Sequence, residues 1–196
     1  MERKDFFENF TSTATQVNLL KAGKNIPVKI SRYVMTDSRH NFDGSEKENA
    51  PEYEDATPQL AVVFVSTTSD GVITHRYNGQ GFKKYSDLSA KDIQSGKFVD
   101  VDGYACTKDR KGNLVRIEDE EKTEACRNIL SGLFNSLGLP EGSGMEDLDR
   151  AVQNEYTLAI DIVSEDYEGK EQLRVKRTRK IGEQSEAQKS LNTFSE

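Results

Sequence analysis

Residues 155–180 read EYTLAIDIVSEDYEGKEQLRVKRTRK and have the pattern of a single β-hairpin. In the first half, large apolar residues recur at every second position, the period of two expected of a half-buried strand: Tyr156, Leu158, Ile160 and Ile162. Acidic residues followed by Gly169 suit the connecting turn, because glycine accepts positive φ angles. The second half, residues 170–180, contains six Lys or Arg and one Glu, so it predicts a strongly basic return strand.

This basic strand allows two interpretations. It is either a surface that binds a phosphate backbone or a solvated edge strand, where Lys and Arg discourage pairing with other chains. Simple alternation predicts that Arg174 and Lys176 share one face of the strand. It places Arg177 and Arg179 on the other face with Val175, partly inward.

Composition restricts the class of protein. The chain has 196 residues, a net charge of −7 and a sequence pI near 5.1, which argues against a protein that coats nucleic acid with its whole surface. A local basic groove remains compatible with this charge. The only cysteines, Cys106 and Cys126, form no CxxC motif, which favours a reduced compartment. We find no pattern of a signal peptide and no apolar run long enough to span a bilayer, so we expect a cytoplasmic protein with no membrane partner, in the host cytoplasm if phage-encoded.

The rest of the chain supplies the other elements of the fold. Strands are predicted at 24–36, 58–66 and 72–78, the last continuing through 82–85; helices at 86–95, 119–137 and 145–152; and a second hairpin at 97–118. Three strands, a helical region and two strands is the element order of an OB barrel. We therefore predict a mainly β fold with helices, a five-stranded OB-fold barrel with the inserted hairpin and helices between strands three and four. The competing arrangement is an open antiparallel sheet with helices on one face, an α+β fold.

The predicted domain organisation has three parts. They are an N-terminal arm at 1–22, an OB-fold domain at 23–181 and a disordered C-terminal tail at 182–196. Within the domain we distinguish an acidic loop at 37–57 and the hairpin and helical insertion at 86–152. Residues 43–55 of the loop contain six acids and one Lys and almost no core-forming residues, so we expect a mobile loop whose deletion leaves the fold intact.

One part of the chain resembles a known family. Residues 129–142 read ILSGLFNSLGLPEG, and a helix, a strand, YEGKE at 167–171 and the basic strand follow. This arrangement is similar to small bacteriophage proteins of the OB-fold single-stranded DNA-binding family. The resemblance implies that fold and a role in phage DNA replication or recombination. The chain departs from better-known members in its acidic loop between strands one and two and in lacking a strongly acidic C-terminal tail.

Basic and aromatic residues alternate in several predicted strands, as expected of a surface that binds single-stranded DNA. Bases stack on aromatic rings, while Lys and Arg neutralise phosphates. In an OB barrel strands one to three form the usual binding face, and we expect strand five to pair with strand one at its margin. The alternative is that Tyr77 and Phe82 belong to the core and the lysines are merely solvated. The candidate DNA-binding residues are Lys29, Arg32, Tyr33, Arg76, Tyr77, Phe82, Lys83, Lys84, Tyr85, Arg174, Lys176, Arg177 and Arg179.

Metal and enzyme signatures are weak. The cysteines and histidines show no zinc-finger spacing, so we expect no metal and no cofactor. A Mg²⁺-dependent nuclease can be built from Asp161, Glu168 and Lys170, but the last two fall in a turn, which suits octahedral coordination poorly. There is no Walker loop or GxSxG motif.

These observations rank the possible functions. The first hypothesis is a non-enzymatic protein that binds single-stranded DNA with little sequence preference. The second is a protein-interaction or structural accessory factor of a phage replication complex, and the nuclease comes third. Replication or recombination proteins are expected partners, and an oligomer is compatible with the sequence.

Overall fold

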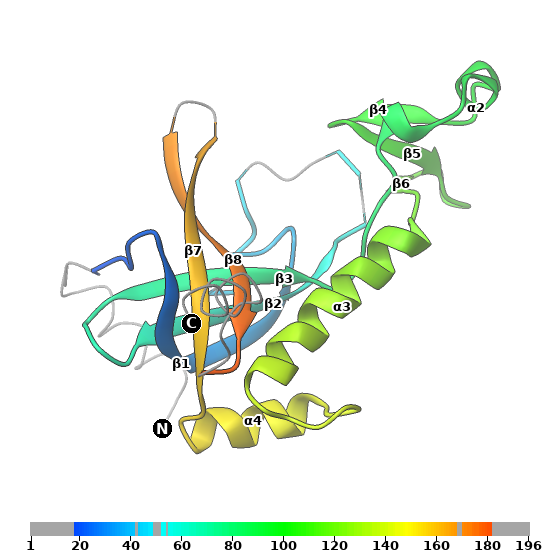
Figure 1. Ribbon diagram of the computed structural model, residues 1–196. Helices are drawn as coiled ribbons and strands as arrows, with labels where there is room; N and C mark the ends of the chain where they lie inside the picture. The colour runs from blue at the N-terminus through cyan, green and yellow to red at the C-terminus, as the bar shows by residue number, and fades with distance from the viewer. Residues whose placement is uncertain (1–17, 42, 49–51, 54, 168–169, 182–196) are drawn as a thin grey trace, which may run out of the picture.

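The computed structural model describes residues 18–41, 43–48, 52–53, 55–167 and 170–181. They form a mainly β protein with two antiparallel sheets and several helices, as predicted (Figure 1). The main sheet contains β1 (Gly23–Asp37), β2 (Pro58–Ser66), β3 (Val72–Asn78), β7 (Thr157–Tyr167) and β8 (Lys170–Arg179). The small sheet contains β4 (Val99–Val101), β5 (Tyr104–Lys108) and β6 (Leu114–Arg116). The helices are α2 (Ala90–Gln94), α3 (Glu120–Ser136) and α4 (Met145–Gln153), with a 3₁₀ turn at Tyr85–Asp87.

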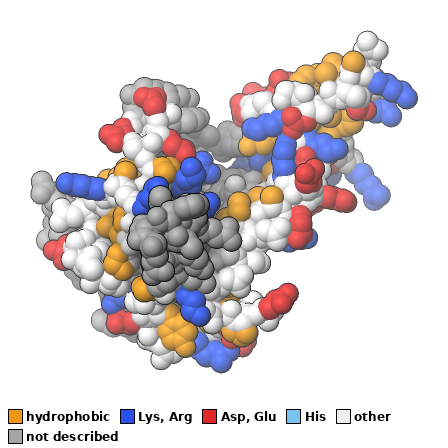
Figure 2. Space-filling view, viewed as in Figure 1, with side chains coloured by type: hydrophobic (Ala, Val, Ile, Leu, Met, Phe, Trp, Pro, Cys, Tyr) orange, Lys and Arg blue, Asp and Glu red, His pale blue; other side chains and the backbone are white. Residues whose placement is uncertain are grey.

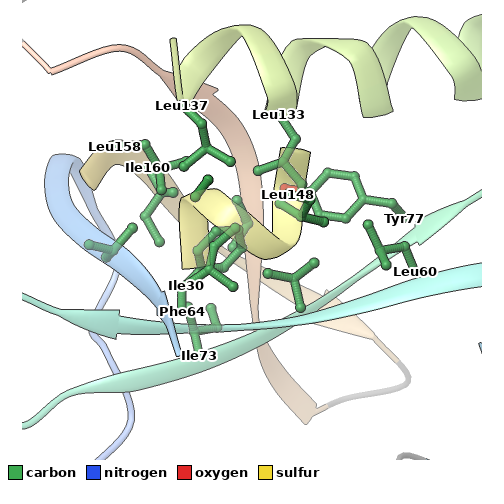
Figure 3. Packing of buried hydrophobic residues seen from close by; sticks show 14 of the residues in the cluster. Ile30, Leu60, Phe64, Ile73, Tyr77, Leu133, Leu137, Leu148, Leu158 and Ile160 are labelled. Carbon is green, nitrogen blue, oxygen red and sulfur yellow. The ribbon is translucent and has the colours of Figure 1, made fainter. Parts of the chain in front are cut away.

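The main sheet has the strand order β3-β2-β1-β7-β8. β1 pairs with β2 and β7, so the expected pairing of the last strand with the first is wrong. Among the described residues β3 and β8 do not pair, and the sheet is open between them. Helix α3 contacts both of these edge strands, and with α4 it covers the inner face of the sheet (Figures 1 and 3).

The main core lies between this inner face and the helices. Its largest fully buried side chains include Phe64 of β2, Leu133 of α3, Leu148 of α4 and Ile160 of β7 (Figure 3). The predicted boundaries of α3 are confirmed within a residue or two. The Asp119 carboxylate caps the helix by accepting from the Lys122 backbone N–H at 3.1 Å, and Gly138 follows its end with φ +76°.

Two β-bulges change which side chains face the core. In β1 the register passes from Ile30 opposite Phe64 to Arg32 opposite Val63, which leaves Ser31 as the extra residue. In β8 it passes from Val175 opposite Ile162 to Arg177 opposite Asp161, which leaves Lys176 as the extra residue. Each bulge reverses the alternation beyond it.

The faces predicted for Arg177 and Arg179 are therefore wrong, because both residues lie on the outer face with Asp161. Beyond the bulge in β1, Tyr33 lies opposite Val62 and packs against the core. A bulge depends on pairing with a neighbouring strand, so strict alternation along one strand cannot reveal it.

The small sheet projects from the N-terminal end of α3 (Figure 1). The segment predicted as a hairpin at 97–118 forms its three strands, β4, β5 and β6. The prediction that residues 82–85 continue β3 is wrong, because Phe82 bridges Glu118 and Lys84 bridges Tyr104 of the small sheet. The helix predicted at 86–95 is divided into the 3₁₀ turn at Tyr85–Asp87 and the short helix α2, which is capped by the Ser89 hydroxyl.

The acidic loop is anchored to the small sheet. Tyr53 is buried, 7% exposed, beside Val101 and Cys106. The Asp55 carboxylate accepts from the Arg116 backbone N–H at 2.7 Å and from its Nε–H at 2.8 Å. The Arg116 guanidinium also lies 3.7 Å from the centre of the Phe82 ring. The expectation that this loop contributes almost nothing to the core is wrong for its second half.

The predicted N-terminal arm and C-terminal tail lie mostly outside the described residues. Of the arm, Leu20 belongs to the main core, and Leu19 forms a parallel bridge with Val72 at the start of β3.

Candidate nucleic-acid interface

A cleft of about 760 Å³ lies between the unpaired edges of β3 and β8. It occupies the position where pairing of these strands would close the sheet. We call it the seam cleft; its lining is Thr74, His75, Arg76, Tyr77, Asn78, Cys126, Ile129, Glu165, Leu173, Arg174, Val175 and Lys176. Strand pairing puts Arg76 and Arg174 on the outer side of the sheet and His75 on the inner side. The cleft therefore has a cationic rim and a less polar floor.

Three exposed cations of β8 lie at this rim or next to it: Arg174 and Lys176 line the cleft, and Arg177 follows them along the strand. Lys176 and Arg177 are exposed, and neither has an ion-pair partner among the described residues. Arg174 is also exposed, with its guanidinium 3.4 Å from the Glu165 carboxylate at the surface, a pair of small energetic value. We call Arg174, Lys176 and Arg177 the cationic strip. Figure 2 shows Lys and Arg side chains gathered over the hairpin of β7 and β8, beside apolar side chains.

Arg179 has a structural position instead. It forms an ion pair with Asp161 in which the side chains are only 13% and 12% exposed, and it donates to the Asn25 side-chain oxygen at 3.0 Å. Asp161 additionally accepts from the Asn25 backbone N–H at 2.9 Å. Because Arg179 pairs with Ala159, it lies on the outer face, so the prediction that it points partly inward is wrong. The expected structural role agrees with its buried ion pair.

His75 is a cleft residue that is absent from the DNA-binding candidates chosen by sequence. It lies opposite Val62 on the inner side of β3, and its ring packs edge-to-face against Tyr77 with centroids 4.6 Å apart. Burial, and secondly the charge of Arg174, lower the pKa of His75 to about 4, so the imidazole is neutral at neutral pH. In the sequence, His75 is indicated only by its position two residues before Tyr77, a spacing that places both side chains on the same face of a strand.

Tyr77 and Phe82 are buried, so the prediction that they are exposed stacking platforms is wrong. The Tyr77 side chain is 4% exposed and lies beside Leu60, Leu133 and Leu148 (Figure 3). Burial raises its pKa, and its hydroxyl has no hydrogen-bond partner among the described residues. Phe82 is 8% exposed under the Arg116 guanidinium. The alternative interpretation, that both rings are core residues, describes them correctly.

The predicted residues of β1 lie away from the seam cleft. Lys29 donates to the Glu155 carboxylate at 2.6 Å, and Arg32 is exposed on the outer face. The Tyr33 hydroxyl donates to the Asp149 carboxylate at 2.5 Å. Burial and this carboxylate raise the pKa of Tyr33 to about 12.

The other candidates divide between the cleft and the small sheet. Arg76 lines the cleft and donates to the Gln59 side-chain oxygen at 2.9 Å and to the His40 carbonyl at 3.2 Å. Lys83, Lys84 and Tyr85 lie at the base of the small sheet, with the Lys84 ammonium 3.7 Å from the centre of the Tyr104 ring. Of the thirteen candidates, the structure brings Arg76, Tyr77, Arg174 and Lys176 together at the seam cleft, with Arg177 next along β8.

No group of three or more His, Cys, Asp or Glu side chains suited to a metal ion occurs in the described part of the chain. Asp161 of the nuclease hypothesis is engaged by Arg179 and Asn25. Glu168 and the side chain of Lys170 lie outside the described residues. Of the three nuclease candidates, only the contacts of Asp161 are therefore described.

Comparisons of the chain with protein-family models, curated proteins and solved structures gave no match. No helix within the described ranges is both long and apolar enough to cross a membrane.

Proposed function

We propose that this protein binds single-stranded DNA with little sequence preference, through the cationic strip and the seam cleft, and acts in phage DNA replication or recombination. The order β3-β2-β1-β7-β8 supports an OB-type barrel left open between its third and fifth strands. Helix α3 precedes the fourth such strand, as the OB element order requires. The resemblance of residues 129–142 and 167–171 to phage single-stranded DNA-binding proteins supports the same role.

The observation that carries the proposal is the pairing of exposed cations with a partly apolar cleft. Arg174 and Lys176 lie at the cleft rim, where they would neutralise phosphates. The floor of the cleft is reached between two strand edges, a shape that admits an unpaired base more readily than a duplex. Contacts of these kinds accept any base, because every base offers a flat π surface and the backbone is constant. The protein needs no cofactor for this role.

Affinity for a dT oligonucleotide across a salt series tests the proposal. We expect the triple change Arg174→Ala, Lys176→Ala and Arg177→Ala to lower the slope of log affinity against log salt by about 2, since each phosphate contact on a single strand contributes roughly 0.7. Replacing Lys108, Arg110 and Lys111 by Ala is the matched control, because it removes the same charge from an exposed turn of the small sheet. Equal effects of the two triple variants, or no binding by the unaltered protein at micromolar concentration, would contradict the proposal.

The unpaired edges of β3 and β8 favour one alternative, an accessory factor that binds an extended peptide by strand addition. Such a protein would bind a replication or recombination protein but would not bind the oligonucleotide. A measurement of the oligomeric state would not distinguish DNA binding from peptide binding.

A further inference from the structure

The seam cleft gives solvent access to the inner side of the main sheet. His75 points to the core side of β3, yet it is only partly buried, because β8 does not cover this part of the β3 edge. The cleft volume of about 760 Å³ falls within the size range of small-molecule pockets. A planar group entering from the rim would meet the His75 ring at the floor.

The His75 imidazole has unused hydrogen-bonding capacity. Its edge-to-face contact with Tyr77 occupies the ring on one side, but none of the described residues is hydrogen-bonded to its nitrogens. Partly buried polar groups in native proteins are usually paired with protein or water. A neutral imidazole offers one donor and one acceptor, which match the edge of a nucleobase.

Helix α3 contributes an exposed apolar side chain to the same cleft. Ile129 lines it and is 60% exposed, whereas Leu133, one turn further along the helix, is fully buried. Burying this side chain against a flat ring would remove apolar surface from water. Arg174 and Lys176 are themselves lining residues of the same cleft, and both are exposed.

We propose that the seam cleft is a nucleobase pocket, in which one unstacked base of the bound strand lies against His75 and Ile129. The proposal rests on the function proposed above and adds that affinity depends on a base as well as on the backbone. Arg174 and Lys176 hold the flanking phosphates, so the backbone and base contacts are separable. His75 is then a base-contacting residue and Ile129 the opposite wall.

The test compares a dT oligonucleotide with an abasic oligonucleotide of the same length. We expect the unaltered protein to prefer the dT strand, and His75→Ala to lower affinity for dT about 5- to 150-fold, the effect of losing one stacked base. Affinity for the abasic strand and the salt slope should stay unchanged. His75→Phe should keep most of the preference for dT. Ile129→Ser should reduce that preference without unfolding the protein, because this side chain is already 60% exposed.

Tyr156→Ala is the matched control, since this aromatic side chain is 44% exposed and does not line the cleft. Melting temperatures at pH 7 confirm that each variant is folded. If folded His75→Ala and Ile129→Ser variants retain the full preference for dT, the pocket proposal is overturned while DNA binding stands. If the unaltered protein binds neither strand, the proposed function itself fails.

Discussion

A single inserted residue decides which side chains of the basic strand face outward, where the proposed DNA contacts lie. Because Lys176 is the bulged residue of β8, Arg174, Arg177 and Arg179 share the outer face with Asp161. Only Arg179 is engaged by this carboxylate, which leaves Arg177 exposed. Neighbouring arginines on one face thus have different roles, one in stability and one in the proposed DNA contacts.

Arg177→Ala and Arg179→Ala should therefore separate stability from binding. We expect Arg179→Ala to lower the free energy of unfolding by about 2–4 kcal/mol, because it leaves Asp161 nearly buried without its counter-charge. Arg177→Ala should change stability by less than about 0.5 kcal/mol and lower the salt slope by roughly 0.7. Urea unfolding and salt titration measure the two effects. A larger loss of stability in Arg177→Ala than in Arg179→Ala would show that the bulge assignment is wrong.

His75 should make stability depend on pH. The unfolded chain takes up a proton near the ordinary pKa of 6.5, whereas folded His75 does so only near 4. Its contribution to stability is therefore complete above pH 6.5 and is lost as the pH falls toward 4. Between pH 7 and 5 we expect the unaltered protein to lose about 1–2 kcal/mol more stability than His75→Phe. Parallel pH profiles in urea unfolding would exclude this role.

At the scale of elements, helix α3 connects the two sheets. Its C-terminal half packs in the main core, where the Ser136 hydroxyl contacts the Thr178 hydroxyl of β8 at 3.0 Å. Its N-terminal end packs against Gly81, whose backbone N–H donates to the Thr123 hydroxyl at 2.9 Å. A Cβ at Gly81 would lie 2.4 Å from Lys122 Cβ, which is too close, so the contact with the helix requires glycine at this position.

Gly81→Ala should accordingly destabilise the protein by about 1–3 kcal/mol through overpacking against the helix backbone. Gly132→Ala, within α3, is the matched control, because a Cβ there meets nothing within 4 Å. It should stabilise by up to about 1 kcal/mol through helix propensity. Melting temperatures of the two variants should move in opposite directions. A rise in both would mean that α3 does not rest on Gly81.

At the scale of the whole molecule, the loop between β1 and β2 ties the main sheet to the small sheet. Tyr53 and Asp55 supply a core residue and the carboxylate partner of Arg116. With the described part of the chain, residues 43–48 form hydrogen bonds only inside the loop, such as Ser45 with Asp43 and Lys47 with Ser38. The contacts with the small sheet therefore belong to the second half of the loop, whereas its acidic residues are divided equally between 43–48 and 52–55.

Deleting residues 43–55 should expose the buried cluster of the small sheet, which contains Tyr53, Val101 and Cys106. This result would be contrary to the expectation from the sequence. Deleting residues 43–48 should leave the cluster buried. Cys106 reports the difference, since it is fully buried beside Tyr53. In a Cys126→Ser background, we expect a thiol reagent to label Cys106 rapidly only after the longer deletion. Slow labelling in both deletions would mean that the loop is dispensable for the small sheet.

The linear sequence carries the features that arise from local periodicity. The strands of both hairpins, helix α3 and the basic character of β8 all follow from burial patterns within one element. Arg174 and Lys176 are accordingly candidates on the sequence pattern alone. Local patterns reveal which elements exist, because each element must bury its own apolar face.

The composition of the site depends on contacts between distant segments. His75 and Ile129 meet at the cleft because β3 and β8 remain unpaired beside α3, and Asp55 meets Arg116 across 61 residues. The bulges at Ser31 and Lys176 likewise exist only in pairing with a neighbouring strand. Only the tertiary structure decides whether a ring is exposed, which group pairs with a charge and which way the side chains of a bulged strand face. Each of these depends on how distant segments pack against one another.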